Sequence, residues 1–288
     1  MTAHARSYLE LTKPGITLFI GITAGAGFIT ALGGWGMPGR MLVMLAATML
    51  MSGGAATLNQ VAEEKWDALM LRTSRRPLPA GIITARSARA FGWSLSALGL
   101  ALALAFLPWA TALFLVLCHV SYVNAYTPLK RRTPLCTLTG AIPGALPVLA
   151  GWAATGVPID VAALALTGVL FMWQIPHFLA IGWMARDDYR TAGCPMLSVV
   201  EGSGRASARV SLMYATAMVV CAAVVGITSS AGSLYMVTVA LTGAAYVHFA
   251  WQFVRHRERV PARRLFFSSL IVLPLLLSAL MVDLVLPG

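Results

Sequence analysis

Long apolar runs alternate with short polar segments along almost the whole chain. A helix needs about 20 mostly apolar residues to cross the hydrocarbon core of a bilayer. Such runs lie roughly at residues 16–35, 41–62, 89–107, 109–127, 138–155, 161–184, 208–228, 233–254 and 265–286. The pattern predicts an all-α polytopic membrane protein with about nine transmembrane helices. No soluble domain fits between the runs, so residues 1–288 are expected to form a single integral-membrane domain.

The composition supports this prediction and changes how the charge is interpreted. Hydrophobic residues make up 58% of the chain and charged residues only 11%, whereas about 25% is usual in soluble domains. A net charge of +11 would suggest nucleic acid in a soluble protein. Here the basic residues lie in the gaps between apolar runs, which is typical of anchoring at a membrane surface. We expect the lipid bilayer as surroundings and no nucleic-acid partner.

The basic residues also predict an orientation. Of the 21 lysines and arginines, all except Arg40 fall in gaps on one side of the predicted membrane. The positive-inside rule then places the N-terminus in the cytoplasm and the C-terminus outside. The first apolar run is too long for a signal sequence, and no long transit peptide precedes it. We therefore expect a multi-pass protein of a bacterial inner (cytoplasmic) membrane.

Oxygen-bearing side chains gather at the cytoplasmic end of the second run. Asn59, Glu63 and Asp67 follow each other at intervals of four, which places them on one face of a helix. Mg²⁺ is usually bound by one or two carboxylates together with phosphate oxygens of a substrate. The alternative is a solvated helix end with ordinary surface charges. Three arginines follow, Arg72, Arg75 and Arg76, and the guanidinium group matches phosphate geometry. We expect Pro77 and Pro79 to end this helix.

A second acidic pair, Asp187 and Asp188, follows the sixth run. The second and sixth helices would cross in the same direction, which suggests a parallel internal repeat whose halves face one another. Two facing acidic sites suit a diphosphate bridged by Mg²⁺, and Lys130 and Arg131 in the fourth gap are further candidates for contacting it. Taken singly, each basic residue is better explained as a membrane-surface anchor, and it is the convergence of three gaps that favours a diphosphate site.

Polar residues also lie inside the sixth run. Gln174 and His177 are at membrane depth, where polar side chains are costly and are candidates for function. Pro176 between them frees a backbone carbonyl, which is tolerated where the backbone is buried or lines a cavity. The alternative is a core histidine bonded to Gln174 or to a backbone carbonyl. His119 and His248 have no such company and are expected to be structural.

Several of these segments resemble one known family. The runs L-T-K-P (11–14), N-Q-V-A-E-E-K-W-D-A-L-M-L-R-T-S-R-R-P-L-P (59–79), Y-T-P-L-K-R-R-T-P-L (126–135), W-Q-I-P-H-F (173–178) and D-D-Y-R-T-A-G-C-P-M-L (187–197) closely resemble the haem O synthase branch of the UbiA-type prenyltransferase superfamily. The resemblance implies a UbiA-like helical bundle, Mg²⁺ as cofactor, farnesyl diphosphate as donor and protoheme IX as acceptor. It also implies that the active site opens to the cytoplasm.

The resemblance implies roles for individual residues. It places the catalytic group at Asn59, Glu63, Asp67, His177 and Asp188. It implies metal ligands at Asn59, Glu63, Asp67, Asp187 and Asp188. It implies substrate contacts at Lys13, Arg72, Arg76, Lys130, Arg131, Gln174, Asp187 and Tyr189. The chain departs from the superfamily's D-x-x-x-D motif, because Met184 stands four residues before Asp188. Which acid binds metal there is left open.

Two other functions are compatible with parts of this pattern. One is a related enzyme that prenylates an aromatic quinone precursor, although the runs at 173–178 and 187–197 favour haem. The other is a haem-handling membrane transporter, since transporters also use broken helices and polar residues at mid-membrane. A transporter does not need an amide, acids and arginines gathered at one end of the helical bundle, so this grouping favours an enzyme. A haem A synthase or a protein of the haem-copper oxidase pathway is a further possible partner.

Overall fold

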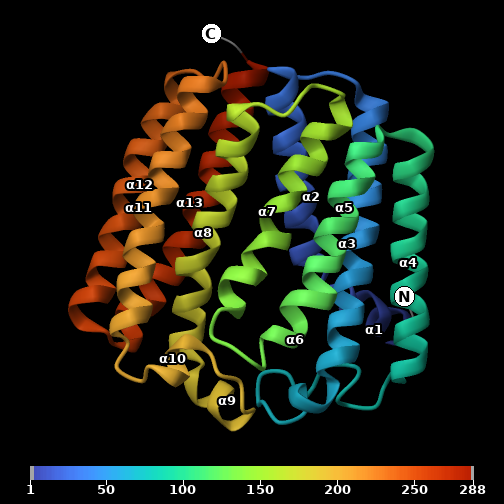
Figure 1. Ribbon diagram of the computed structural model, residues 1–288, viewed down its shortest axis with the longest axis vertical. Coiled ribbons are helices and arrows are strands. Elements are labelled where there is room, and N and C mark those ends of the chain that lie inside the picture. Colours follow the sequence, from blue (N-terminus) through green and yellow to red (C-terminus); the bar gives the residue numbers. More distant parts are fainter. Residues whose placement is uncertain (1–2, 287–288) are drawn as a thin grey trace.

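The computed structural model describes residues 3–286 and contains helices and connecting turns there, with no strand. Within these residues, nine helical segments are long and apolar enough to cross a membrane. They are Pro14–Leu32 (α2), Pro38–Asp67 (α3), Ala85–Phe106 (α4), Trp109–Leu129 (α5, η1 and α6), Cys136–Thr155 (α7), Val161–Met184 (α8), Arg205–Thr228 (α11), Ser233–His256 (α12) and Arg259–Val285 (α13). The predicted all-α, nine-span architecture is confirmed (Figure 1).

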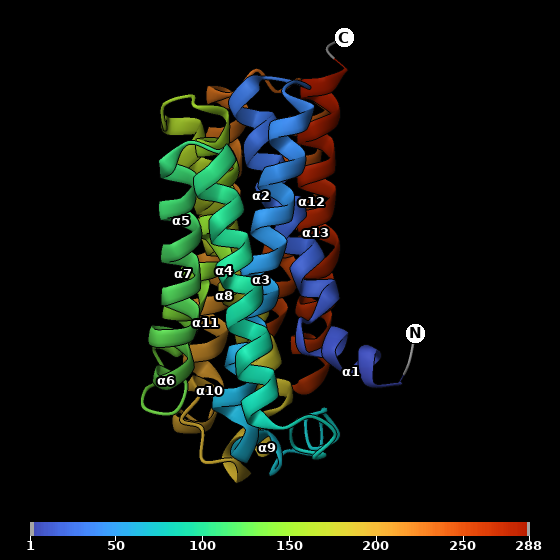
Figure 2. The same ribbon diagram turned by 90° about the vertical axis from the view of Figure 1, so that its right-hand side faces the viewer.

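Three short helices lie at one end of the bundle: Ala3–Leu11 (α1), Arg186–Thr191 (α9) and Leu197–Val200 (α10). Figure 2 shows them at the lower end, beside the loop that follows α3. The prediction that Pro77 and Pro79 end the second transmembrane helix was wrong, because α3 already ends at Asp67. Past that point the chain turns back, and the Thr73 hydroxyl donates to the Asp67 carbonyl at 2.8 Å. The carboxylate of Asp67 therefore belongs to the last turn of α3.

Two apolar cores, one in each half of the bundle, share α2 and α7. One core joins α3, α4 and α5, and the other joins α8, α11, α12 and α13. The two shared helices pack closely, because Gly27 of α2 lies against the Val148 carbonyl and Gly151 of α7 against the Ala24 carbonyl. Small residues permit such approaches between membrane helices.

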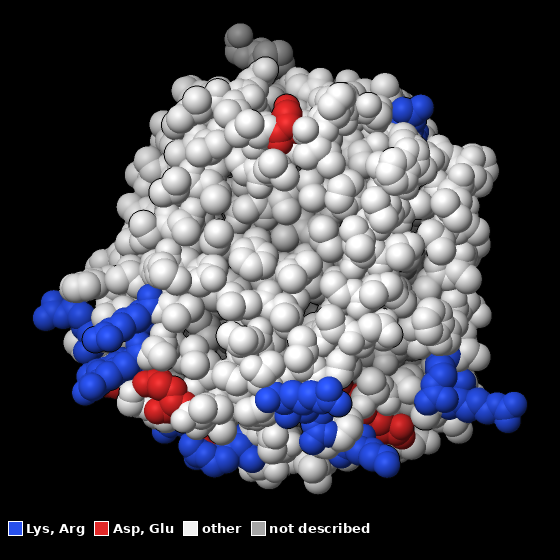
Figure 3. Space-filling model, in the orientation of Figure 1, with Lys and Arg blue, Asp and Glu red and all other residues white. Residues whose placement is uncertain are grey.

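The two halves repeat the same arrangement. The second span, α3, packs along α4, and the sixth span, α8, packs along α11. These pairs are four spans apart and run in the same direction, which agrees with the predicted parallel repeat. Charged side chains gather at the lower edge of the molecule, and its middle is almost free of them (Figure 3). This separation is the one that the positive-inside rule requires, and the orientation itself stays a prediction.

Candidate active site

The three oxygen-bearing residues of α3 lie on one buried face, as the spacing predicted. The relative exposure is 2% for Asn59, 7% for Glu63 and 1% for Asp67. This excludes the alternative of a solvated helix end with ordinary surface charges. A buried carboxylate requires a cation or several hydrogen bonds, and the neighbouring segments supply cations.

Lys130 neutralises Glu63. Its ammonium lies 2.8 Å from Oε1 and 3.0 Å from Oε2 of Glu63, and both side chains are largely buried. Burial alone lowers the pKa of Lys130, but the acidic groups facing it, Tyr126, Glu63 and Tyr189, raise the pKa above its usual value. The lysine is therefore a fixed positive charge beside the acidic face of α3.

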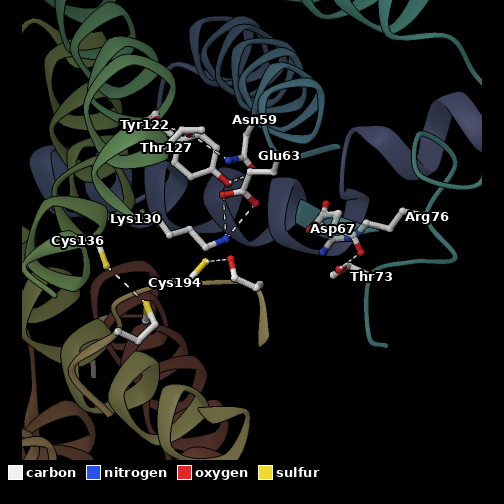
Figure 4. A network of polar contacts seen from close by, with 12 residues as sticks. Asn59, Glu63, Asp67, Thr73, Arg76, Tyr122, Thr127, Lys130, Cys136 and Cys194 are labelled. Atoms are coloured by element: carbon white, nitrogen blue, oxygen red, sulfur yellow. Dashed lines mark hydrogen bonds and ion pairs between the residues drawn. The ribbon is translucent and has the colours of Figure 1, made fainter. Parts of the chain in front are cut away.

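Asn59 is held from three sides. Its amide donates to Thr127 Oγ1 at 3.0 Å, and its Oδ1 accepts from Lys13 Nζ at 3.1 Å and from the Tyr122 hydroxyl at 3.3 Å. Figure 4 shows Tyr122, Thr127 and Lys130 converging on Asn59 and Glu63. Tyr122 lies in the π-helical turn Ser121–Tyr126 (η1), a feature frequent at functional sites. Lys13 has φ = 49° directly before Pro14, so its backbone is held in the left-handed region.

Asp67 has an unused acceptor. Its Oδ2 accepts from Arg76 Nη1 at 2.7 Å, whereas its Oδ1 is buried and has no hydrogen-bond partner. A buried carboxylate oxygen without a hydrogen-bond partner lowers the stability of the fold, and it is available to coordinate a cation. Arg72 is exposed and forms no ion pair among the described residues.

Three distant segments meet around this face. A small cluster packs Met70 against Cys136 and against four residues of the 187–197 run: Tyr189, Ala192, Cys194 and Met196. The Cys136 thiol lies 3.6 Å from the Met196 sulfur. The expected convergence of the second, fourth and sixth gaps is therefore present. The Lys130–Glu63 ion pair joins the fourth gap to the second, and apolar packing attaches the sixth.

The two acids after α8 are arranged differently from those of α3. The side chain of Asp187 is 80% exposed and pairs with Arg190 at 3.1 Å. Asp188 is half-buried, and no hydrogen bond or ion pair of its side chain occurs within the described residues. Asp187 therefore does not join the buried acidic face, and its assignment as a metal ligand and substrate contact stays a prediction. Asp188 remains the candidate from this segment.

The residues present fit Mg²⁺ only together with a substrate. Among the described residues, no three His, Cys, Asp or Glu side chains come together as a metal cage. Mg²⁺ does not require one, because it binds one or two carboxylates and takes phosphate oxygens and water for the rest. The orphaned Asp67 Oδ1, the Glu63 carboxylate and the Asn59 carbonyl oxygen are hard oxygen donors of the appropriate kind.

His177 lies in an aromatic group on the wall formed by α2, α8 and α13. Its ring stacks on Trp173 with centroids 5.1 Å apart and lies 5.0 Å from the ring of Phe266. Its Nδ1 is 2.7 Å from the Ser269 hydroxyl. Phe19 of α2 lies 6.0 Å from Trp173 across this wall. The alternative that His177 is bonded to Gln174 is excluded, because its partner is on α13.

Two other predicted substrate contacts have structural partners. The Gln174 amide donates to the Leu170 and Ala141 carbonyls, at 2.9 and 3.4 Å, so it joins α8 to α7. Its predicted contact with substrate stays a prediction. The Arg131 guanidinium lies 3.2 Å from the centroid of the Trp66 ring, beside the acidic face. Its Nε is buried without a partner, which leaves Arg131 a candidate for an anion.

The expectation of structural histidines agrees with the contacts. His119 is buried and bonds the Ser96 hydroxyl at 2.9 Å, and His248 bonds Gln252 on its own helix at 2.8 Å. Sequence reasoning missed Tyr122, Thr127 and Ser269. Thr127 belongs to the Y-T-P-L-K-R-R-T run and Tyr122 lies four residues before it, so a search for hydroxyl groups in and near the run would have found both. No local signal points to Ser269.

Comparison with known proteins agrees with this geometry. The chain matches the UbiA prenyltransferase family over residues 19–271. It is 38% identical to the protoheme IX farnesyltransferase of Opitutus terrae over 98% of this chain and 95% of that protein.

Solved structures share the fold. A digeranylgeranylglyceryl phosphate synthase superposes with a TM-score of 0.81 at 15% identity, covering 99% of both chains. A UbiA homologue from Archaeoglobus fulgidus bound to GPP and Mg²⁺ superposes with a TM-score of 0.66 at 17% identity, covering 95% of this chain and 99% of that one. The match to the family and the full-length identity establish the relationship: the chain is a member of the UbiA prenyltransferase family and, within it, of the protoheme IX farnesyltransferases.

Proposed function

We propose that this enzyme transfers the farnesyl group of farnesyl diphosphate to a vinyl group of protoheme IX, giving haem O. The C–O bond to the diphosphate breaks, a C–C bond forms to the vinyl carbon, and water adds to the neighbouring carbon. The observation that carries the proposal is the buried row of Asn59, Glu63 and Asp67, each contacted by a basic side chain. Membership in the protoheme IX farnesyltransferases supports the choice of acceptor.

The paired charges suggest how the donor binds. Lys13, Lys130 and Arg76 now contact the oxygens of α3. A bound diphosphate would offer these cations stronger acceptors, and Arg72 and Arg131 lie on the segments beside them. The released oxygens of Asn59, Glu63 and Asp67 would then hold Mg²⁺, with Asp188 as a further candidate ligand. When bound, Mg²⁺ would neutralise charge that develops on the leaving diphosphate.

The basic side chains perform the same stabilisation from fixed positions. Lys130 is largely buried and charged, so little reorganisation is needed as the diphosphate departs. The apolar walls of the bundle keep water from the allylic cation until the C–C bond has formed. Farnesyl chain and porphyrin ring are both apolar with anionic ends, and both would lie with those ends toward the polar mouth.

His177 is our candidate for the acceptor side. The Ser269 hydroxyl donates its hydrogen to the Phe266 carbonyl at 2.5 Å, so it accepts from His177 Nδ1. The other ring nitrogen, Nε2, is then an acceptor. Among the described residues it has no hydrogen-bond partner, and it is not one of the fully buried side-chain atoms that lack one. A flat aromatic wall with a free basic nitrogen suits a porphyrin, or the water that completes the product.

Haem analysis tests the proposal directly. Haems extracted from membranes of a host that lacks this activity should contain haem O only when the gene for this chain is expressed. The mass should exceed that of haem B by one farnesyl group and one hydroxyl group, because the proton of the added water is released. Expression of the folded protein without any haem O would overturn the proposal, and a prenylated quinone precursor in its place would establish the first alternative.

The transporter alternative makes a different prediction. A transporter moves haem without consuming farnesyl diphosphate, whereas the proposed enzyme releases diphosphate only when Mg²⁺, farnesyl diphosphate and haem are all present. A diphosphate-release assay on purified protein separates the two. A complex with a haem A synthase or an oxidase-pathway protein would follow the reaction, and it stays a prediction.

We also propose the orientation that the basic residues favour, with the active site opening to the cytoplasm of a bacterial inner membrane. The site and most basic side chains lie at the same end of the bundle (Figure 3). Reporter fusions near residues 80 and 131 should then report cytoplasm, and fusions near 37 and 157 the outside. A periplasmic signal from the loop after α3 would contradict the orientation.

A further inference from the structure

A groove between α12 and α13 lies outside the proposed active site. Its volume is about 670 Å³, within the range of roughly 300–1,000 Å³ that is usual for ligand pockets. Its walls are mostly apolar, with Leu241 of α12 and Ile271 of α13 among the lining residues. These two side chains are 69% and 59% exposed in the bundle, so the groove opens toward the surrounding lipid. It runs along the middle of α12, residues 241–249, and along the first half of α13, residues 260–272.

The charged residues that line the groove are both arginines, Arg263 and Arg264, near the start of α13. Both are exposed, and neither takes part in any of the ion pairs found among the described residues. The Arg263 guanidinium lies 5.5 Å from the centroid of Phe267, another lining residue. This contact places positive charge at the mouth of the groove.

The turn between α12 and α13 increases this charge. The turn and the two helix ends beside it contain Arg255, Arg257 and Arg259 and a single acid, Glu258. Basic side chains gather at the lower left of Figure 3, below these helices. Anchoring at a membrane surface would explain the charge but does not require a groove beside it. Here arginines without an ion-pair partner lie beside an apolar groove. This combination is complementary to a ligand that has an anionic head group and a hydrocarbon chain.

We propose that this groove binds one anionic phospholipid of the cytoplasmic leaflet. The phosphate would lie between Arg263 and Arg264, whose guanidinium groups can each give two parallel hydrogen bonds. One acyl chain would lie along Leu241 and Ile271. Basic pockets between membrane helices on the cytoplasmic side are known to recognise anionic head groups. Farnesyl diphosphate shares this chemistry, but its proposed site is the buried face of α3, whereas this groove is open to lipid and contains no acid to hold Mg²⁺.

The experiment measures lipid retained by the full-length protein in detergent, by native mass spectrometry after incubation with phosphatidylglycerol or phosphatidylcholine. We expect one tightly bound phosphatidylglycerol and several-fold weaker retention of phosphatidylcholine. Arg263→Gln/Arg264→Gln should reduce phosphatidylglycerol retention at least fivefold. Ala245→Trp, which fills the groove and keeps both arginines, should reduce it similarly. Arg86→Gln/Arg89→Gln, at exposed positions of α4, is the matched control and should leave retention unchanged.

The controls make each outcome decisive. Equal losses in both double-arginine variants would mean that only general charge matters and would overturn the proposal. Unchanged retention in Ala245→Trp would show that no chain enters the groove and would also overturn it. Displacement of the lipid by farnesyl diphosphate would make the groove a substrate site instead. None of these readouts depends on turnover, so the proposal can fail while the proposed reaction stands.

Discussion

The ends of α3 and α8 occupy equivalent places in the two halves of the bundle, yet the acidic side chains at the two ends differ in burial and in pairing. Asp67 is 1% exposed and has one carboxylate oxygen without a partner. Asp187 is 80% exposed and pairs with arginines of its own segment. A buried carboxylate with one unpaired oxygen can still coordinate a cation, whereas an exposed carboxylate already has its charge neutralised by neighbouring arginines and its oxygens hydrated by water. The comparison suggests that α3 supplies the main donor site, beside which Tyr189 of α9 packs in one cluster with Met70.

The largest effect is expected from a substitution of Lys130, the cation that pairs with Glu63 on the buried face of α3. Lys130→Met leaves Glu63 buried without its cation, and removal of one partner of a buried pair costs about 3–5 kcal/mol. We expect a large fall in the thermal unfolding midpoint of the detergent-purified protein. The double variant Glu63→Gln/Lys130→Met should recover much of it. Equal destabilisation by the single and double variants would show that the pair is not the cause.

Asp67→Asn tests the unused oxygen. The change removes the charge and keeps the shape, so we expect kcat/KM to fall at least tenfold, which corresponds to about 1.4 kcal/mol. Glu64→Gln, on the same helix but outside the set of contacts described above, is the matched control and should remain within twofold. Near-normal turnover of folded Asp67→Asn would exclude a metal role for Asp67.

Ser269→Ala addresses the wall around His177. Loss of the hydroxyl frees the imidazole to change tautomer and orientation, and we expect haem O formation to fall several-fold with donor affinity unchanged. His177→Ala should have a larger effect of the same kind, with altered haem absorption. A structural role would instead lower folded yield and reduce haem and donor binding together.

The smallest effects are expected at the exposed acid. Exposed ion pairs contribute about 0–1 kcal/mol, so Arg190→Gln should leave the unfolding midpoint almost unchanged. Asp187→Asn should alter turnover less than twofold, whereas Asp188→Asn should reduce it several-fold. Equal losses of turnover at Asp187 and Asp188 would refute the assignment of Asp188 as the contributing acid.

Local patterns predicted the parts of the site that lie on one helix. The four-residue spacing of Asn59, Glu63 and Asp67 requires only helical geometry, and the structure agrees. The partners could not be predicted in this way, because Lys13 and Thr127 reach Asn59 from 46 and 68 residues away. Their approach depends on how α2, α3 and η1 pack. The partners of Gln174 could not be predicted for the same reason, since packing of α8 against α7 provides one of its acceptors.

The end of α3 shows a second limit. Pro77 suggested a longer helix, but α3 already ends at Asp67 and Thr73 bonds back to the Asp67 carbonyl. The sequence 68–76 contains no glycine or proline to announce this turn. The consequence is functional, because the turn brings Arg76 back to Asp67, whereas a continuous helix would carry it about 13 Å further along the axis.

The central claim is that the buried face of α3 binds the diphosphate through Mg²⁺. The most direct test is the affinity for farnesyl diphosphate with and without Mg²⁺, measured on purified wild-type, Asp67→Asn and Asp187→Asn proteins. The account predicts that Mg²⁺ tightens binding at least tenfold in the wild-type and Asp187→Asn proteins and has little effect on Asp67→Asn. An equal Mg²⁺-dependent gain in all three proteins would contradict it.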